Sequence, residues 1–355
     1  MIIEDQAFSA CRNAKGSIVI PNSIKRIGTS AFANCDSITR FELLGDSTPI
    51  LANEICRGDI GLKEIAISEH LTIPYRMFSW CSGLEQLTIN NKLENNVFES
   101  CAGLKELVSN STSFGDRAFI GCYSLEKVVL TNPNLVFGDY TFDGCPKLNT
   151  FGPLSDGEDK YDFSFAWETE IPAKAFQRSW DADSRKSVKE VTLPKKLLKI
   201  GELAFHNATT LSQILVSGES VVKNWTVLPS TLREIDTNAF ESCTSLRRME
   251  IPATVDTIGP RAFGGCTALI AVIMNTSAIA PKIDAFEDAL FKNNSFLPNL
   301  TIYVPTVVLE DGVATDNYGK FWNACSTRYD EESGKEIIEY VMVKEATPTN
   351  LEGVR

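Results

Sequence analysis

The sequence predicts an α/β repeat solenoid, a curved superhelix with a parallel β-sheet on its concave face and short helical or 3₁₀ turns opposite. Three observations predict it: a period of mostly 20–24 residues, an apolar pattern fixed within that period, and cysteines locked to the same register. One residue marks each copy, namely Phe8, Phe32, Cys56 in a degenerate third copy, Phe78, Phe98, Phe119, Phe142, Phe176, Phe205, Phe240, Phe263 and Phe286.

Each copy divides into a strand, a turn and a compact return. The alternation in Leu246–Ile251 predicts a short strand, and Pro252 ends it because proline cannot donate to a β-ladder. Apolar residues then recur every three to five positions from Ile258 through Phe263 to Cys266. This spacing predicts a tight helical or 3₁₀ turn that points several side chains inward.

Stacking of the copies explains why the same residues recur. A single copy exposes apolar surface on both sides, so it is stable only between neighbours. We expect each ladder Phe to lie on the Phe of the next copy, and each Cys and Leu to stack in the same way. The copies would then share one continuous core and one parallel sheet.

The cysteines follow the repeat rather than a disulfide or metal pattern. Eight of the ten lie three residues after a ladder Phe, and only Cys56 and Cys325 fall outside that register. Free Cys behaves as a small buried apolar residue, and no C-x-x-C pair is present. The sequence therefore predicts free thiols in the core, no metal site and no cofactor.

The repeated run I-G-x-x-A-F-x-x-C-x-x-L-x-x-I-x-I-P, as in Ile235 to Pro252, resembles the BspA-like leucine-rich repeat. The chain's end also resembles that family's closing element, with Ile302, Tyr303, Val304 and Pro305 followed by Tyr318 and Trp322. The resemblance implies a leucine-rich-repeat superhelix. It also implies a secreted or cell-surface protein that binds host proteins or other cells.

We expect two parts in the chain. Residues 3–305 form the solenoid of about twelve repeats, with an irregular insertion at 152–187, and residues 306–355 form a C-terminal capping segment. The first copy begins at Ile3, which leaves no N-terminal cap for an apolar end. Either the chain is a trimmed piece of a longer secreted protein or something else covers that end.

Composition narrows the partners and the location. The net charge of -12 disfavours nucleic acid and anionic lipid, and no apolar run is long enough for a membrane helix. The N-terminal residues do not form a signal peptide. The resemblance implies an extracellular or cell-surface location, from which we expect that a signal sequence has been removed.

The sequence favours binding over catalysis. It has only His70 and His206, far apart in the register, and its carboxylates form no recognisable catalytic motif. We therefore expect a non-catalytic binding or adhesion module whose partner is a protein or glycan on a host or neighbouring cell. The alternative is a structural spacer or assembly component of a larger secreted protein or particle.

Two surfaces are candidates for binding. The aromatic insertion carries Tyr161, Phe163, Phe165, Trp167 and Trp180, and Trp225 lies in another irregular step. These rings either anchor a partner or pack on the flank of the solenoid, and packing is favoured. The second candidate is the outward strand column, which contains Arg40, Glu64, Gln86, Glu106, Lys127 and Arg248. Its mixed charges are also typical of a solvated face.

One tripeptide, Arg57-Gly58-Asp59, has a sequence that integrins can recognise. The tripeptide lies in the turn of the degenerate third copy, with Asp59 at the Cys position of the repeat. The sequence favours the structural interpretation, because a tripeptide of common residues often occurs by chance.

Overall fold

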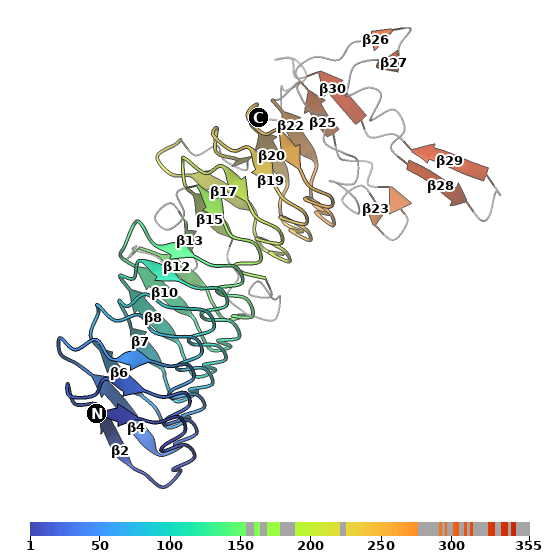
Figure 1. The fold of residues 1–355 in the computed structure, drawn as a ribbon. Helices are drawn as coiled ribbons and strands as arrows, with labels where there is room; N and C mark the ends of the chain where they lie inside the picture. The colour runs from blue at the N-terminus through green and yellow to red at the C-terminus, as the bar shows by residue number, and fades with distance from the viewer. Residues whose placement is uncertain are drawn as a thin grey trace. The chain divides into compact units, whose positions relative to one another are not determined.

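In a computed structural model of the protein, the fold consists of short strands that follow one another along the chain (Figure 1). The structure describes residues 1–153, 160–163, 169–177, 189–220, 225–275 and 301–304, together with the isolated strands at 291–292, 295–296, 309–310, 313–314, 326–330, 335–339 and 342–345. The chain forms two compact units. The first comprises Met1–Trp167 and Lys174–Lys186, and the second comprises Glu168–Ala173 and Ser187–Arg355.

In the first unit, parallel strands of successive copies pair with one another. The pairing orders are β1-β3-β5, β2-β4-β6, β7-β8-β10-β12-β13 and β9-β11. The strands are β1 (Ile2–Ile3), β2 (Gly16–Val19), β3 (Arg26–Ile27), β4 (Ile38–Leu43), β5 (Ile50–Leu51), β6 (Glu64–Ile67), β7 (Gln86–Thr88), β8 (Glu106–Ser109), β9 (Ser113–Phe114), β10 (Lys127–Leu130), β11 (Val136–Phe137), β12 (Thr150–Gly152) and β13 (Lys160–Asp162).

In the second unit the same pattern continues. Parallel pairing gives the orders β14-β16-β19-β21, β15-β17 and β18-β20-β22-β25-β30, and three pairs, β23-β24, β26-β27 and β28-β29, are antiparallel. The strands are β14 (Glu170–Ile171), β15 (Glu190–Leu193), β16 (Lys199–Ile200), β17 (Gln213–Val216), β18 (Thr226–Val227), β19 (Glu234–Ile235), β20 (Arg248–Ile251), β21 (Thr257–Ile258), β22 (Ala271–Met274), β23 (Phe291–Lys292), β24 (Ser295–Phe296), β25 (Thr301–Val304), β26 (Leu309–Glu310), β27 (Val313–Ala314), β28 (Ser326–Asp330), β29 (Lys335–Glu339) and β30 (Met342–Glu345).

The predicted phenylalanine ladder is confirmed where the structure describes it. The rings of Phe98, Phe119 and Phe142 stack nearly parallel, with centroids 5.3 and 5.5 Å apart. In the second unit Phe205, Phe240 and Phe263 stack in the same way, 5.1 and 5.4 Å apart. These stacked rings are buried and form the centre of the apolar core in each unit, whereas the first ring, Phe8, is 48% exposed. Phe286, predicted as the last member, lies outside the described residues.

The third copy lacks its ring, and a neighbouring side chain compensates. Cys56 occupies the ladder position and is fully buried. Phe41, from strand β4, makes edge contacts with Phe32 on one side and Phe78 on the other, at 6.4 and 5.9 Å between centroids. The predicted degeneracy of the third copy therefore leaves the aromatic column continuous.

The ladder cysteines have a hydrogen-bonding role in addition to packing. The thiol of Cys101 donates to the carbonyl of Phe78 at 3.2 Å, and that of Cys122 donates to the carbonyl of Phe98 at 3.3 Å. Cys35, Cys145, Cys243 and Cys266 donate in the same way to the ladder Phe of the copy before. The nine described cysteines are free thiols, and all of them except Cys11 are buried.

The prediction of helical or 3₁₀ turns is wrong for the described residues, which contain no helix. The chain instead makes consecutive tight turns. In most described copies two residues four positions apart have a positive φ, for example Ser30 (54°) and Asn34 (60°). A right-handed helix cannot continue through such residues. Their amides bond to the next copy: those of Ser30, Phe32 and Asn34 donate to the carbonyls of Asn53, Ile55 and Arg57.

A second short strand in many copies was also not expected. The pair before the recurrent glycine forms β3, β9, β11, β16 and β21 in five of them. The glycine that follows packs directly on the backbone of the adjacent copy: a Cβ added at Gly28 would lie 2.4 Å from the amide nitrogen of Asp5. Glycine is required there because no side chain fits between the two copies.

Candidate functional site

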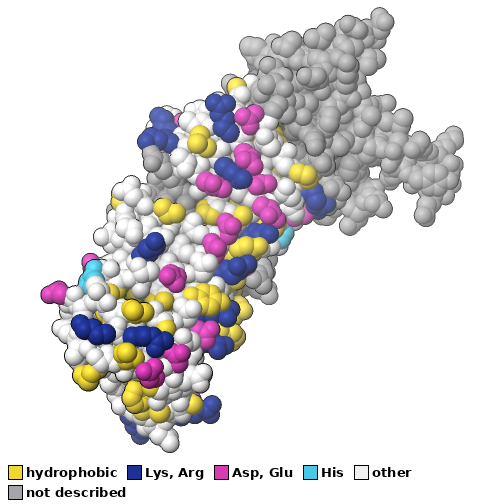
Figure 2. Space-filling model, in the orientation of Figure 1, with side chains coloured by type: hydrophobic (Ala, Val, Ile, Leu, Met, Phe, Trp, Pro, Cys, Tyr) yellow, Lys and Arg dark blue, Asp and Glu magenta, His cyan; other side chains and the backbone are white. Residues whose placement is uncertain are grey.

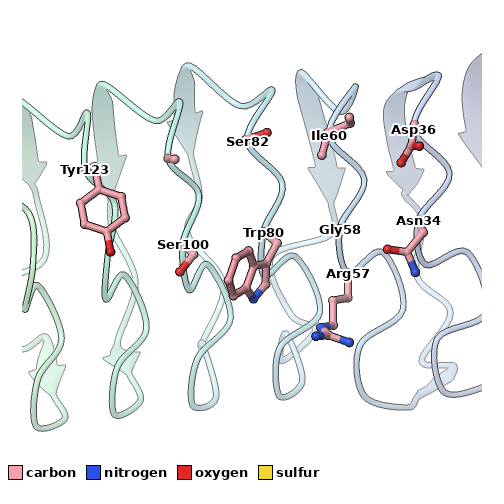
Figure 3. Close-up of a pocket in the computed structure, with 10 residues that line it drawn as sticks. Asn34, Asp36, Arg57, Gly58, Ile60, Trp80, Ser82, Ser100 and Tyr123 are labelled. Carbon is pink, nitrogen blue, oxygen red and sulfur yellow. The ribbon is translucent and has the colours of Figure 1, made fainter.

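A groove crosses five successive copies in the first unit. It encloses about 590 Å³ and is lined by Asn34, Asp36, Arg57, Gly58, Ile60, Trp80, Ser82, Ser100, Ala102 and Tyr123. We call it the Trp80 groove (Figure 3). Nearly all of these residues lie immediately before or after the ladder Cys of their copy, or after Asp59, which replaces Cys in the third copy.

The residues on either side of the ladder Cys point outward because the Cys side chain itself points into the core. The Cys81 side chain is buried and donates to the carbonyl of Cys56 at 3.1 Å, so Trp80 and Ser82 on either side of it face away from the core. The same holds for Ser100 and Ala102 around Cys101. The groove is therefore formed by two parallel columns of side chains, one on each side of the buried column.

Large apolar side chains are exposed along this groove. Ile60 is 53% exposed, Trp80 is 52% exposed and Tyr123 is 57% exposed. Figure 3 shows the rings of Trp80 and Tyr123 at a similar level, with Ser100 between them and with Arg57 and Asn34 toward the other end. Exposed aromatic rings beside polar groups in a concave site are typical of binding sites.

Trp80 adopts a backbone conformation that is unfavourable for a bulky residue. Its φ is 65°, in the left-handed region. The equivalent position, just before the ladder Cys or its replacement, also has a positive φ in the other described copies, but there it holds small or short polar residues: Ala10, Asn34, Gly58, Ser100, Gly121, Gly144, Asn207, Ser242 and Gly265. Glycine and asparagine tolerate this conformation best. Bulky residues such as Tyr140 and Leu203 also have a positive φ, four residues earlier in their own copies, so what distinguishes Trp80 is a large ring at a position that is otherwise held by small residues in the described copies.

The charges at the ends of the groove are balanced by neighbours. The Arg57 guanidinium lies 3.8 Å from a carboxylate oxygen of Glu54, and Asp36 lies 3.6 Å from Arg12. The Arg57 side chain remains 45% exposed. The groove thus presents polar groups of both kinds, donors and acceptors, without an excess of either charge.

Asp59 lies beneath the groove and has no exposure to solvent. Its Oδ1 accepts a hydrogen bond from the amide of Cys35 at 2.7 Å, while Oδ2 has no partner among the described residues. Burial raises the pKa of Asp59 to about 7, an effect that the Cys35 amide partly offsets. The buried carboxylate cannot reach an integrin, so the structure agrees with the structural interpretation of Arg57-Gly58-Asp59.

The strand column predicted from sequence has the expected register. Arg40 pairs with Glu64, Gln86 with Glu106, and Glu106 with Lys127 across adjacent strands. Neighbouring members form ion pairs, at 2.5 Å between Arg40 and Glu64 and 2.9 Å between Lys127 and Glu106. Arg248, half-buried, opens strand β20 of the second unit. Figure 2 shows acidic and basic side chains interspersed over this view of the molecule.

The described part of the aromatic insertion belongs to the core. Tyr161 and Phe163 are buried and pack against Phe151 and Phe176, and the Tyr161 hydroxyl donates to the carbonyl of Leu148 at 2.9 Å. Trp225 is also buried, in a cluster with Ala271, Ile273 and Tyr303. These three rings have almost no surface left for a partner. Phe165, Trp167 and Trp180 lie outside the described residues, as do Pro305, Tyr318 and Trp322.

The two histidines belong to different units. His70 is exposed and contacts the Ser47 carbonyl at 3.3 Å. His206 is half-buried, and it lies 3.4 Å from Glu241. Burial lowers the pKa of His206, and Glu241 partly offsets that effect. Within the described residues no group of three or more His, Cys, Asp or Glu could hold a metal ion, and no helix could cross a membrane.

Sequence reasoning missed the Trp80 groove, although a signal was present. Aligning the copies on the ladder position places Trp80 in a column that is otherwise mostly Gly, Asn, Ser and Ala and has no second aromatic residue. Tyr123 falls in a column whose one other aromatic residue is Trp180. The predicted helical turn concealed this signal, because positive φ values are not expected at any position of such a turn.

Comparisons with known proteins agree with the repeat. The sequence matches the family described as BspA type leucine rich repeat region (6 copies) over residues 1–105, 59–149 and 218–311, more than half of the chain. No curated protein matches it. The chain is similar to a leucine-rich repeat protein from Bacteroides ovatus, with 24% identity, coverage of 77% of this chain and 70% of that one, and a TM-score of 0.53.

A second similar structure is a leucine rich cell surface protein from Faecalibacterium prausnitzii. It has 20% identity, covers 81% of this chain and 80% of its own, and has a TM-score of 0.46. The repeat period, the parallel strands, the stacked phenylalanines and the matched family agree on one conclusion. The chain belongs to the BspA-type leucine-rich repeat family.

Proposed function

We propose that the chain is a non-catalytic binding or adhesion module of a cell-surface or secreted protein. Its partner is a protein or glycan on a host or neighbouring cell, and it engages that partner through the Trp80 groove. Family membership supports the general role, since leucine-rich-repeat solenoids serve as interaction surfaces. Family and fold alone do not determine what is bound, which depends on the residues of the site.

The observation that carries the proposal is the exposed ring of Trp80 in the groove, at a position where the other described copies have small residues. A bulky residue at positive φ costs on the order of 1 to 3 kcal/mol, and an exposed ring recovers little of that by packing. Bulky residues with a positive φ recur in this repeat, as at Tyr140 and Leu203, so the conformation alone does not single out Trp80; its exposed position in the groove does. Tryptophan, tyrosine and arginine, all present in this groove, are the residue types that most often dominate binding energy.

The strand column is the weaker candidate for the contact surface. Arg40, Glu64, Glu106 and Lys127 already satisfy one another as ion pairs. Exposed ion pairs of this kind contribute little to affinity. We therefore assign the strand face to solvent and the groove to the partner.

Binding of the labelled protein to live bacterial and animal cells tests the proposal. We expect saturable binding to at least one cell type, reduced at least about tenfold by Trp80→Gly, as is typical for loss of a central aromatic contact. Lys127→Ala, on the strand face, should leave binding within about twofold. Absence of saturable binding to every cell type, or equal loss in both variants, would count against the proposal.

A further inference from the structure

The groove's chemistry indicates the class of its ligand. We propose that the Trp80 groove binds an extended, uncharged oligosaccharide that runs across the repeats, with sugar rings stacked on Trp80 and Tyr123. This inference rests on the proposed function and specifies its partner. It follows from the aromatic rings, from the polar side chains of the groove and from the hydrogen bonds that the backbone along the groove already makes.

The aromatic rings supply the stacking faces. The faces of Trp80 and Tyr123 carry negative π density, which attracts the weakly positive C–H groups on the face of a sugar ring. The two residues belong to copies two steps apart, and the ring centroids of the intervening ladder advance by 5.6 and 5.3 Å per step. Successive rings of an extended oligosaccharide advance by a similar step, so Trp80 and Tyr123 would stack on rings two positions apart.

The polar side chains suit hydroxyl groups. Asn34 and the two serines, Ser82 and Ser100, each offer both donors and acceptors, Arg57 offers only donors, and Asp36 offers acceptors. A sugar hydroxyl is itself both a donor and an acceptor. The mixed donors and acceptors of these side chains can therefore hydrogen-bond to several sugar hydroxyls. Gly58 has no side chain, and the Asn34 side chain fills the space beside it: a Cβ added at Gly58 would lie 2.6 Å from Asn34 Oδ1.

An extended peptide is a poorer fit because the backbone along the groove is already paired. The amides of Gly58, Trp80 and Ser100 donate to the carbonyls of Ser79, Glu99 and Ile120 in the next copy. The carbonyls of the same three residues accept from the amides of Ile60, Ser82 and Ala102. A peptide that binds by adding a strand needs free backbone groups at an edge. Recognition in this groove must therefore use side chains.

The balance of charge favours a neutral ligand. Arg57 and Asp36 each have an oppositely charged neighbour outside the groove, Glu54 and Arg12. The whole chain carries a net charge of -12, which repels polyanions. An acidic polysaccharide would therefore meet repulsion without a compensating basic cluster.

Calorimetric titration with defined hexasaccharides tests this inference. The probes are linear hexasaccharides of β-linked glucose, mannose and N-acetylglucosamine, with a heparin-derived hexasaccharide as the charged comparator and an extended neutral peptide as the polypeptide comparator. We expect at least one neutral hexasaccharide to bind, and the two comparators not to. Trp80→Gly and Tyr123→Ala should each weaken that binding at least about tenfold, whereas Tyr123→Phe, which keeps the ring, should stay within about threefold.

Trp80→Gly is informative because it should fold at least as well as the parent. Glycine tolerates the positive φ, so we expect an unchanged or higher melting temperature together with the loss of binding. Lower stability in this variant would count against strain at Trp80 and would overturn the inference that the ring is kept for binding.

The outcomes separate this inference from the proposed function. Cell binding that depends on Trp80 but survives enzymatic removal of surface glycans, with no hexasaccharide bound, would overturn the oligosaccharide and leave the binding module standing, with a protein partner. Tightest binding of the heparin fragment would overturn a neutral ligand. Hexasaccharide binding without any cell binding would support the groove's chemistry and contradict the adhesion role.

Discussion

Phe119→Ala is expected to lower the free energy of unfolding by about 3 to 5 kcal/mol, the usual cost of removing a large buried aromatic side chain. Phe119 is fully buried and stacks on Phe98 and Phe142, and it also makes an edge contact with Phe114 at 5.2 Å between centroids. Its removal leaves a hole with packed rings on three sides. Because neighbouring copies stabilise one another, both adjoining interfaces weaken.

Glu126→Ala is the matched control for that substitution. Glu126 is exposed and lies seven residues further along the same copy. Its replacement should change the free energy of unfolding by no more than about 0.5 kcal/mol. Denaturant melts of the two variants provide the measurement. Equal and small effects would show that Phe119 is not part of a stacked column and that the assigned register is wrong.

Asp59→Asn is expected to stabilise the chain at neutral and alkaline pH but not at acid pH. The pKa of Asp59 is about 7 in the folded chain, against an ordinary value of 3.8. The folded state therefore holds the proton more tightly, and this group's contribution to the free energy of unfolding falls as the pH rises from about 4 to 7. The full effect is up to about 4 kcal/mol, because each pKa unit corresponds to 1.36 kcal/mol.

The difference in the free energy of unfolding between Asp59→Asn and the parent isolates this group. It should be near zero at pH 4 and should grow until about pH 8 in favour of the variant. Asp46→Asn, at an exposed carboxylate, is the control and should show no such trend. A difference that is independent of pH, or that favours the parent at high pH, would mean that Asp59 is ionised at low cost in the folded chain.

The stacking order was predictable because it depends on residue identity at a fixed period. Phe98, Phe119 and Phe142 are each followed three residues later by a Cys, and only one alignment of the copies satisfies both columns. The same alignment set the strand register, so the pairing of Gln86 with Glu106 and of Glu106 with Lys127 also followed.

The turn conformation was not predictable from spacing alone. A 3₁₀ turn and a series of tight turns both place hydrogen bonds between residues three apart, as from the amide of Ala33 to the carbonyl of Ser30. The sign of φ separates them, and the residue types before the ladder Cys, including Gly58, Gly121 and Gly144, carry that information.

Prediction of the Trp80 groove required the same information about the sign of φ. A helical turn gives Trp80 no special status in the sequence, whereas the alternating aromatic residues of the insertion stand out. Tyr161 and Phe163 look similar to surface anchors in the sequence, yet they are buried, because strand β13 pairs with β12 and brings them against Phe151. Alternating aromatic residues do not indicate whether their face meets solvent or another layer.

Site-specific blocking of the groove tests most directly the claim that the chain binds through it. In a Cys11→Ser background, which removes the one exposed cysteine of the described residues, Ser82→Cys places a reactive thiol in the groove. Lys92→Cys places a reactive thiol at an exposed position beyond the other end of strand β7. Each protein is coupled to the same bulky polymer, and binding to cells is measured before and after coupling. We predict that polymer at position 82 reduces cell binding at least about tenfold and that polymer at position 92 leaves it within about twofold. Equal binding by the two conjugates, or a greater loss at position 92, would contradict the assignment of binding to the Trp80 groove.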